Sequence, residues 1–532
     1  MKQISRENFT VFFAFALLYL AVAGGHLYSP DEEIMFRVTE SLATRARLDI
    51  EPIAVPGRGT FATKAGVNGR EYAQYGIANS LFAVPFYWLG DFVGRMLGDE
   101  ICRRLFEFRT THYVLEPTGR GLALARRFGV SLFGIFVAAA TCALLWRLVA
   151  HRLAPACFRS REGPALDPPQ WRMANRAAWL TTLAYGAGTM ALPHSRTFFS
   201  EPLATFFVLL SFYCLATSEI LGIKRAFWAG IAFAGALLTR LDSVVVLPAV
   251  VATMGLVLLD TPGLPLRMRL RQPAASVIRL LVSPRALTAY VAFCIGPLLF
   301  ACLQAYLNYR HFGSVFTTAY ADQPEGVKFS TPLLAGLYGY FFSIGKSLLL
   351  FSPALLLGFF GWRAFWERQL ELAFGAMLAI VLLLLFHARW QNWAGGWCWG
   401  PRHVFMLHVF AILPVMEFVR DWTRARKIAY ACVMVPAFVV QLYGSSQSFI
   451  DFYVLYYRTP EAPPNAYVMY SPEDLEPRLS LAPINDSIYV PQNSQWYRYA
   501  EMWDLGYTDN LWLRWWKRAH GRERPVAEQL GI

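Results

Sequence analysis

Residues 286–309 read ALTAYVAFCIGPLLFACLQAYLNY, a run of 24 residues without Asp, Glu, Lys or Arg. As an α-helix this run rises about 36 Å, more than the ~30 Å of hydrocarbon in a bilayer. Comparable runs recur along most of the 532 residues, of which 56% are hydrophobic and only 16% charged. Soluble proteins carry about 25% charged residues. The sequence therefore predicts an all-α polytopic membrane protein and excludes disordered, fibrous and small disulfide-rich proteins.

About eleven spans follow from these runs, at 9–28, 128–147, 177–193, 202–219, 226–239, 243–259, 286–309, 347–362, 372–388, 403–418 and 428–450. Short basic loops lie in the cytoplasm, and the loop 260–285 carries five Arg residues. We therefore predict N-in, C-out topology. Residues 1–450 form a transmembrane domain with a large first outer loop, 29–127. Residues 451–532 form a small extracytoplasmic C-terminal segment.

The net charge of +13 does not indicate nucleic-acid binding. Its Arg residues are dispersed at helix ends and in short loops, where they set topology. We predict membrane lipid and no nucleic acid among the partners. The apolar stretch 77–97 contains Pro85, and we expect a helix that lies in or dips into the outer leaflet rather than a span.

Residues 226–259 would be about 51 Å long as one helix, which is too long for a bilayer. We expect a hairpin instead, with the turn Arg240-Leu241-Asp242 in a recess below the outer surface. Charges at that depth face water, protein or a ligand. A local Arg240–Asp242 pair that only closes the hairpin is an equal alternative.

The first outer loop begins with residues 29–33, SPDEE. Ser29 suits an N-cap, Pro30 suits the first helical position, and Glu32 completes a capping box. Apolar residues then recur every four positions, which predicts an amphipathic juxtamembrane helix on the membrane surface.

The three acids at the start of this helix, Asp31, Glu32 and Glu33, have different expected roles. Glu32 and Glu33 complement the helix dipole, and Glu32 also has the capping role. Complementing the dipole is the alternative for Asp31 as well, but Asp31 has no capping role and follows the first span directly. An acid fixed on a rigid element at the water–lipid boundary is a candidate general base.

Further charged and aromatic residues recur at the outer ends of the spans. Several cations on one face suit a phosphate ligand held by charge-assisted hydrogen bonds. The Trp-rich segment 390–399 is interrupted by glycines, which indicates a shaped loop, and Trp faces also stack on sugar rings. An ordinary aromatic belt is the alternative for this segment.

Five motifs follow one another after the first span: PDEEIMFRVTESL (30–42), EYAQYGIANSLFAVPFYWLG (71–90), PHSRTFFSEPLATFFVLLSFY (193–213), LLTRLDS (237–243) and WAGGWCWGPRH (393–403). Over roughly residues 9–420 this ordered set resembles the GT-C class of membrane glycosyltransferases. That class includes the protein O-mannosyltransferase-like and aminoarabinose-transferase-like bacterial families. The second family has a Lys-Pro-Pro run where this chain has Tyr72-Ala73-Gln74-Tyr75-Gly76, so the resemblance does not extend to the sugar.

The resemblance implies an inverting glycosyltransferase that uses a polyprenyl-phosphate sugar donor. The implied base is Asp31, with Glu32 adjacent. The expected donor-phosphate ligands are Arg196, Arg240, Lys346, Arg389 and Arg402. The expected substrate-binding residues are Tyr72, Tyr75, His194, Glu201, Asp242, Trp397 and His403.

The expected location is the bacterial inner membrane, with the active site facing the periplasm and a glycan, lipid or protein as acceptor. No cofactor is required, and we expect no metal site, although the reaction leaves room for a divalent metal. Three other readings compete with this one. They are a secondary transporter or lipid flippase, a polymerase or ligase of polyprenyl-linked glycans, and a structural subunit of an envelope complex.

Overall fold

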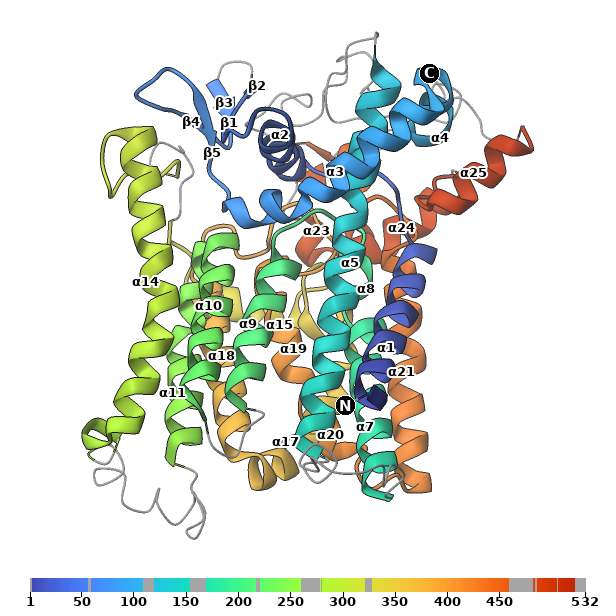
Figure 1. The fold of residues 1–532 in the computed structure, drawn as a ribbon. Coiled ribbons are helices and arrows are strands. Elements are labelled where there is room, and N and C mark those ends of the chain that lie inside the picture. Colours follow the sequence, from blue (N-terminus) through green and yellow to red (C-terminus); the bar gives the residue numbers. More distant parts are fainter. Residues whose placement is uncertain are drawn as a thin grey trace.

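The computed structural model describes residues 2–55, 59–108, 119–153, 169–216, 221–259, 278, 280–320, 328–458, 482–483, 486–504 and 506–521. A bundle of long helices dominates these residues (Figure 1). Its members are α1 (Lys2–Ala21), α5 (Arg120–Leu153), α7 (Pro169–Gly188), α9 (Glu201–Ala216), α10 (Ile223–Thr239), α11 (Leu247–Leu259), α14 (Pro284–Phe312), α17 (Leu355–Arg368), α18 (Leu370–Ala388) and α21 (Arg424–Gly444).

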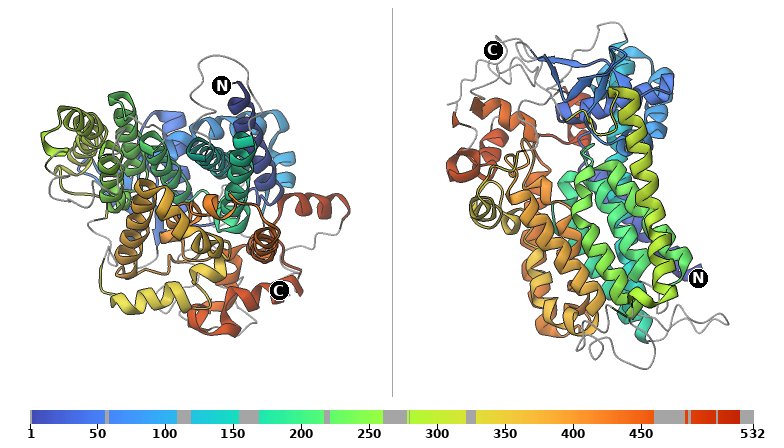
Figure 2. Two further views of the ribbon diagram at one scale, coloured as in Figure 1. Left: turned by 90° about the horizontal axis from the view of Figure 1, so that it is seen from below. Right: turned by 90° about the vertical axis from the view of Figure 1, so that its left-hand side faces the viewer.

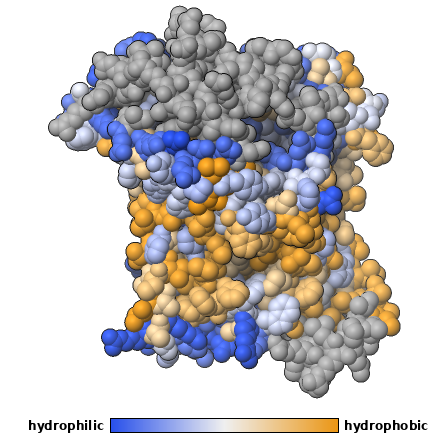
Figure 3. All heavy atoms as spheres, turned by 180° about the vertical axis from the view of Figure 1, so that it is seen from behind, coloured by the Kyte–Doolittle hydropathy of each residue, from blue (hydrophilic) through white to orange (hydrophobic). Residues whose placement is uncertain are grey.

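Among the described residues, five helical stretches are long and apolar enough to cross a membrane: 120–153, 241–259, 284–312, 370–388 and 424–444. On the face drawn in Figure 3, a mainly apolar band lies between two hydrophilic zones. The prediction of a mainly helical membrane protein is therefore confirmed. The count of eleven spans and the N-in orientation stay predictions.

Some predicted spans are divided into shorter helices. The stretch 347–362 is split into α16 (Leu348–Phe351) and α17, with Pro353 between them. Proline lacks the N–H that a continuing helix needs. The stretch 403–418 contains η2 (Arg402–Val404), α19 (Leu407–Ile412) and α20 (Val415–Phe418). Two further short helices, α8 (Ala191–His194) and α15 (Leu333–Phe342), lie between longer ones.

The predicted hairpin is present. Helix α10 ends at Thr239, and the 3-10 helix η1 (Leu241–Val246) leads into α11. Close helix contact accompanies it, because a Cβ on Gly230 would lie 2.0 Å from the Phe293 carbonyl of α14. The turn itself is held against the start of α9, where Arg240 Nη1 donates to Glu201 Oε1 at 2.6 Å.

The first outer loop covers one end of the bundle, opposite the N-terminus (Figure 1). Its described residues before α5 form three helices, α2 (Pro30–Arg45), α3 (Ile77–Leu97) and α4 (Asp99–Phe106). Helix α3 lies obliquely over this end (Figure 1). Its expected position in the outer leaflet stays a prediction.

Short strands, which the sequence does not predict, accompany the helices of this loop: β1 (Asp49–Ile50), β2 (Ile53–Val55), β3 (Gly59–Phe61), β4 (Thr63–Ala65) and β5 (Glu71–Ala73). They form one sheet in the order β1-β5-β4 and a separate β2-β3 pair, all antiparallel.

The described part of the C-terminal segment packs on the same end of the bundle (Figure 2). It comprises α22 (Phe449–Tyr456), β6 (Tyr457–Arg458), β7 (Ala482–Pro483), α23 (Asp486–Tyr489), η4 (Pro491–Asn493), α24 (Gln495–Asp504) and α25 (Leu511–Ala519). The Leu511 N–H donates to the Ala23 carbonyl at 2.8 Å. This contact joins the C-terminal segment to the exit of the first helix.

Candidate active site

Asp31 lies at the start of α2, directly after the loop that follows α1. The Ser29 hydroxyl accepts from the Glu32 N–H at 3.4 Å, and Pro30 opens the helix, as the sequence predicts. The Asp31 carboxylate accepts from the Tyr75 hydroxyl at 2.7 Å and from Arg402 Nη2 at 2.7 Å. Its side chain is 20% exposed. Two donors thus fix a carboxylate that solvent still reaches.

The next two acids point into the protein. Glu32 is fully buried and accepts from the Tyr28 N–H at 2.8 Å. Burial raises the pKa of Glu32 to about 8, although the N–H groups of Tyr28 and Phe198 oppose the shift. Glu33 is also fully buried and pairs with Arg127 at 2.7 Å. Both acids are therefore integrated in the protein interior, and of the three only Asp31 is in contact with solvent.

Asp31 belongs to a network of polar contacts that joins several helices at the end of the bundle covered by the first large loop. Each member contacts the next one in this series: Tyr75, Asp31, Arg402, Glu201, Arg240, Asp242 and His387. We call these seven residues the outer polar cluster. They come from α2, the start of α9, the α10–η1 turn, the end of α18, η2 and the segment before α3.

The cluster alternates in charge. Arg402 Nε lies 3.9 Å from Glu201 Oε1, and Arg240 Nη1 donates to the same oxygen at 2.6 Å. The Arg240 guanidinium also holds both oxygens of Asp242, at 3.0 and 2.7 Å. His387 Nε2 lies 3.3 Å from Asp242 Oδ2. The local Arg240–Asp242 pair that the sequence allows is present. Acids distant in sequence add to it, because Glu201 pairs with Arg240 and Asp31 pairs with Arg402.

A small cavity opens beside the cluster, lined by Glu201, Arg240, Asp242, Ser243, Leu383, His387, His403 and Met406. Its free space of about 10 Å³ is room for about one water. His403 stacks on Trp390 with ring centroids 4.4 Å apart, and neither of its ring nitrogens has a partner among the described residues. A buried imidazole whose ring nitrogens have no partner among the described residues therefore lines the cavity.

Two of the predicted phosphate ligands are engaged elsewhere. Arg196 is buried and pairs with Asp509, and it also donates to the Ser445 carbonyl. Lys346 is buried, and its Nζ contacts the segment 396–400. Arg389, a third predicted ligand, is exposed and donates to the Phe329 carbonyl at 3.2 Å. The structure thus brings Arg402 to Asp31 and Arg240 into the same cluster, and it gives the other three cations different partners.

The predicted substrate-binding residues divide in the same way. Tyr75, Glu201, Asp242 and His403 lie in the cluster or its cavity. The other three predicted residues have partners outside the cluster. Tyr72 stacks on His311, and Trp397 stacks on Tyr453. His194 Nε2 lies within hydrogen-bonding distance of the Trp399 carbonyl.

Two members of this neighbourhood are absent from the predicted site residues. His387 has a weak sequence signal, because it ends an apolar run before Arg389 and Trp390. Phe199 lies under the Arg402 guanidinium, 4.3 Å from its ring centroid. A phenylalanine among many in apolar sequence carries no signal for such a contact.

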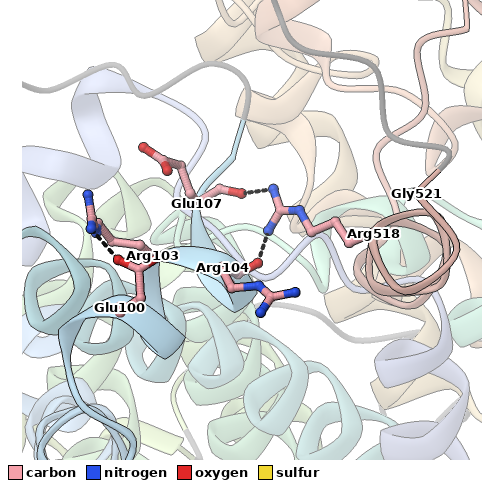
Figure 4. A pocket seen from close by; sticks show the side chains of 6 residues that line it. All are labelled: Glu100, Arg103, Arg104, Glu107, Arg518 and Gly521. Atoms are coloured by element: carbon pink, nitrogen blue, oxygen red, sulfur yellow. Dashed lines mark hydrogen bonds and ion pairs between the residues drawn. The ribbon is translucent and has the colours of Figure 1, made fainter.

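A larger pocket of about 430 Å³ lies between α4 and α25 and contains no predicted site residue. Its lining residues are Glu100, Arg103, Arg104, Glu107, Arg518 and Gly521 (Figure 4). Arg518 donates to the carbonyls of Arg104 and Glu107, and Arg103 pairs with Glu100. These contacts fasten α25 to α4, away from Asp31.

No protein-family model matches the chain, and no curated protein matches its sequence. Among solved structures the chain is similar to ArnT from Cupriavidus metallidurans bound to undecaprenyl phosphate, with 13% identity and a TM-score of 0.42. This match covers 80% of the chain and 62% of ArnT. The apo state of the same protein matches with 13% identity and a TM-score of 0.40, over 79% of the chain and 60% of ArnT. The chain thus spans less than two thirds of these ArnT chains.

Proposed function

We propose that the chain is an inverting glycosyltransferase of the GT-C type. It moves a sugar from a polyprenyl-phosphate donor to an acceptor hydroxyl on the extracytoplasmic face of a bacterial inner membrane. The observation that carries the proposal is the position of Asp31. Its carboxylate is fixed between Tyr75 and Arg402 at the end of the bundle that the first large loop covers, and solvent reaches it.

The chemistry asks for one base and for positive charge on a departing phosphate. Asp31 takes the proton of the acceptor hydroxyl while the acceptor oxygen bonds the anomeric carbon. The bond from that carbon to the phosphate oxygen breaks, and the phosphate keeps its electron pair. A single displacement of this kind inverts the anomeric centre, unlike retaining glycosidases with their second, nucleophilic carboxylate.

Arg402 and Arg240 supply the positive charge. A guanidinium has five N–H donors, and Arg402 Nε has no hydrogen-bond partner among the described residues. Arg240 is 17% exposed and lines the small cavity. Fixed charges of this kind stabilise the charge that develops on the leaving group. Positioning of donor and acceptor adds to the rate.

The proposal requires no resident cofactor, and a divalent ion is a separate alternative to be tested by chelation. Among the described residues, no group of three His, Cys, Asp or Glu residues is arranged to hold a metal ion. The acceptor class is a glycan, a lipid or a protein, and nucleic acid is not proposed as a partner.

Purified protein in detergent, given a panel of radiolabelled polyprenyl-phosphate sugars, tests the proposal. Wild type should turn over one donor, and Asp31→Asn should lose at least a hundredfold in rate, because general bases contribute about 10²- to 10⁴-fold. Glu51→Gln, an exposed acid in the same outer loop, is the matched control and should keep wild-type turnover. Equal turnover by wild type and Asp31→Asn would remove the base assignment. Failure of every donor to bind would favour transport or a structural role.

A further inference from the structure

The ammonium group of Lys346 lies in a cage of main-chain carbonyls. Its Nζ donates to the carbonyls of Gly396, Cys398 and Gly400, each at 3.1 Å, and lies 3.4 Å from the Cys398 sulfur. The Lys346 side chain is only 2% exposed. An ammonium group has three N–H donors, so the three carbonyls use all of them.

This geometry differs from that of a phosphate ligand. A buried charge is tolerated when it is paired or fully hydrogen-bonded, and carbonyl dipoles fill that role around Lys346. Burial lowers the pKa of Lys346, and the Cys398 thiol opposes the shift. Because its three N–H donors are occupied by main-chain carbonyls, the Lys346 ammonium stabilises the conformation of the segment that carries them.

The carbonyls around Lys346 belong to the segment 393–400, whose backbone has an unusual conformation. Gly395, Gly396 and Gly400 have φ angles of 81°, 65° and 67°. Glycine adopts this left-handed region more readily than other residues. With these backbone angles, the carbonyls of Gly396, Cys398 and Gly400 all point toward the Lys346 ammonium. The Cys398 sulfur lies within hydrogen-bonding distance of the Gly395 and Gly400 carbonyls, at 3.4 and 3.2 Å. The segment is thus folded around the Lys346 ammonium and the Cys398 side chain.

The segment leads directly to the outer polar cluster. Gly400 is followed by Pro401 and Arg402, and Arg402 Nη2 donates to Asp31. A Cβ on Gly395 would lie 3.0 Å from Arg402 Cγ. The backbone shape of the segment therefore determines where the Arg402 side chain starts and the surface against which it rests.

We propose that Lys346 is a positioning residue, an internal cation that shapes segment 393–400 and thereby holds Arg402 against Asp31. The shaping of the segment stands independently of the proposed function. Its consequence for sugar transfer rests on that function.

Reactivity of the Cys398 thiol tests the shaping without any assay of activity. Cys398 is completely buried, so N-ethylmaleimide should modify it slowly in the full-length wild-type protein. Lys346→Ala should label at least tenfold faster at Cys398, as measured by peptide mass spectrometry. Labelling of Cys102, also completely buried, should not change. Lys427→Met, which removes an exposed lysine of α21, is the matched control.

Chemical rescue separates a caged cation from a general packing role. Lys346→Ala leaves a space with the shape of n-propylammonium, and this ion at about 100 mM should slow Cys398 labelling again. Tetramethylammonium has the same charge but no N–H donor and should not. Unchanged labelling of Cys398 in Lys346→Ala would overturn the proposal. Equal acceleration at Cys398 and Cys102 without rescue would overturn it too, because it would report general unfolding.

Kinetics test the link to Arg402. Lys346→Ala should lower kcat/KM for the donor, propylammonium should restore part of it, and adding Arg402→Lys should cause little further loss, since both changes act on one contact. Multiplicative losses in the double variant would overturn the link. Absence of transfer by wild type would remove the proposed function, and the labelling experiment would still decide whether Lys346 shapes the segment.

Discussion

Arg402 and Asp31 are 371 residues apart in the chain, and their side chains meet at 2.7 Å. The contact joins the first outer loop to the segment that follows α18. The same guanidinium lies over the Phe199 ring and 3.9 Å from Glu201. One side chain therefore fixes the orientation of Asp31 and presents positive charge beside it.

Arg402→Lys keeps the charge but loses the planar fork that reaches two neighbours. We expect kcat/KM for the donor to fall by about a hundredfold or more. Arg389→Lys is the matched control, because Arg389 is exposed and bonds only a carbonyl in the contacts described for it. It should stay within about threefold of wild type. Equal losses in the two variants would contradict the assignment of Arg402 as the main phosphate ligand.

Tyr75→Phe removes the hydroxyl that donates to Asp31 Oδ1. A hydrogen bond to a charged group contributes about 1.5–3 kcal/mol, and about 1.4 kcal/mol corresponds to a tenfold change in rate. We expect kcat to fall about tenfold or more, with the donor KM unchanged. Tyr72→Phe should have little effect on turnover, since Tyr72 stacks on His311 and its hydroxyl accepts from Asn68. A larger loss in Tyr72→Phe than in Tyr75→Phe would argue against Asp31 as the base.

The capped start of α2 and the hairpin at Arg240 could be predicted from sequence, because each is encoded by neighbouring residues. The same holds for the position of Asp31 shortly after the first helix, α1. The partners of the cations could not be predicted. Arg196 meets an acid 313 residues away, and no local pattern indicates such a contact. From sequence, Lys346 is expected to bind phosphate. Its actual partners are main-chain carbonyls, which every residue type has, so the residue types of the segment do not reveal the contact.

Arg240→Ala and Asp242→Asn distinguish a phosphate ligand from a pair that only closes the hairpin. Arg240 binds Asp242 with two nitrogens, so a phosphate must compete with that carboxylate. If Arg240 binds the donor, Arg240→Ala raises the donor KM about tenfold and Asp242→Asn lowers it. If the pair is structural, both variants lower the free energy of unfolding and neither changes the donor KM selectively. Donor titrations and thermal unfolding of both variants decide between the two.

Because burial raises the pKa of Glu32, we expect this residue to make the protein less stable as the pH rises. Its pKa is raised by burial from 4.5 to about 8, so between these values the folded protein keeps a proton that the unfolded chain has released. Stability falls with pH where the folded state binds more protons. The free energy of unfolding should therefore decrease from about pH 4.5 to about pH 8, by roughly 5 kcal/mol at most from this group.

Glu32→Gln has no proton to release and keeps an oxygen for the Tyr28 N–H. The variant should lose less stability than wild type between pH 5.5 and pH 8.5, as measured by thermal unfolding in detergent. Because wild-type Glu32 is mostly protonated at neutral pH, it is a poor base there, and Glu32→Gln should transfer sugar within about threefold of the wild-type rate. If Glu32→Gln lost transfer while Asp31→Asn retained it, the base would be Glu32. The neutral-pH activity of the enzyme would then depend on the small ionised fraction of a buried carboxyl, and its rate would rise about tenfold per pH unit below pH 8.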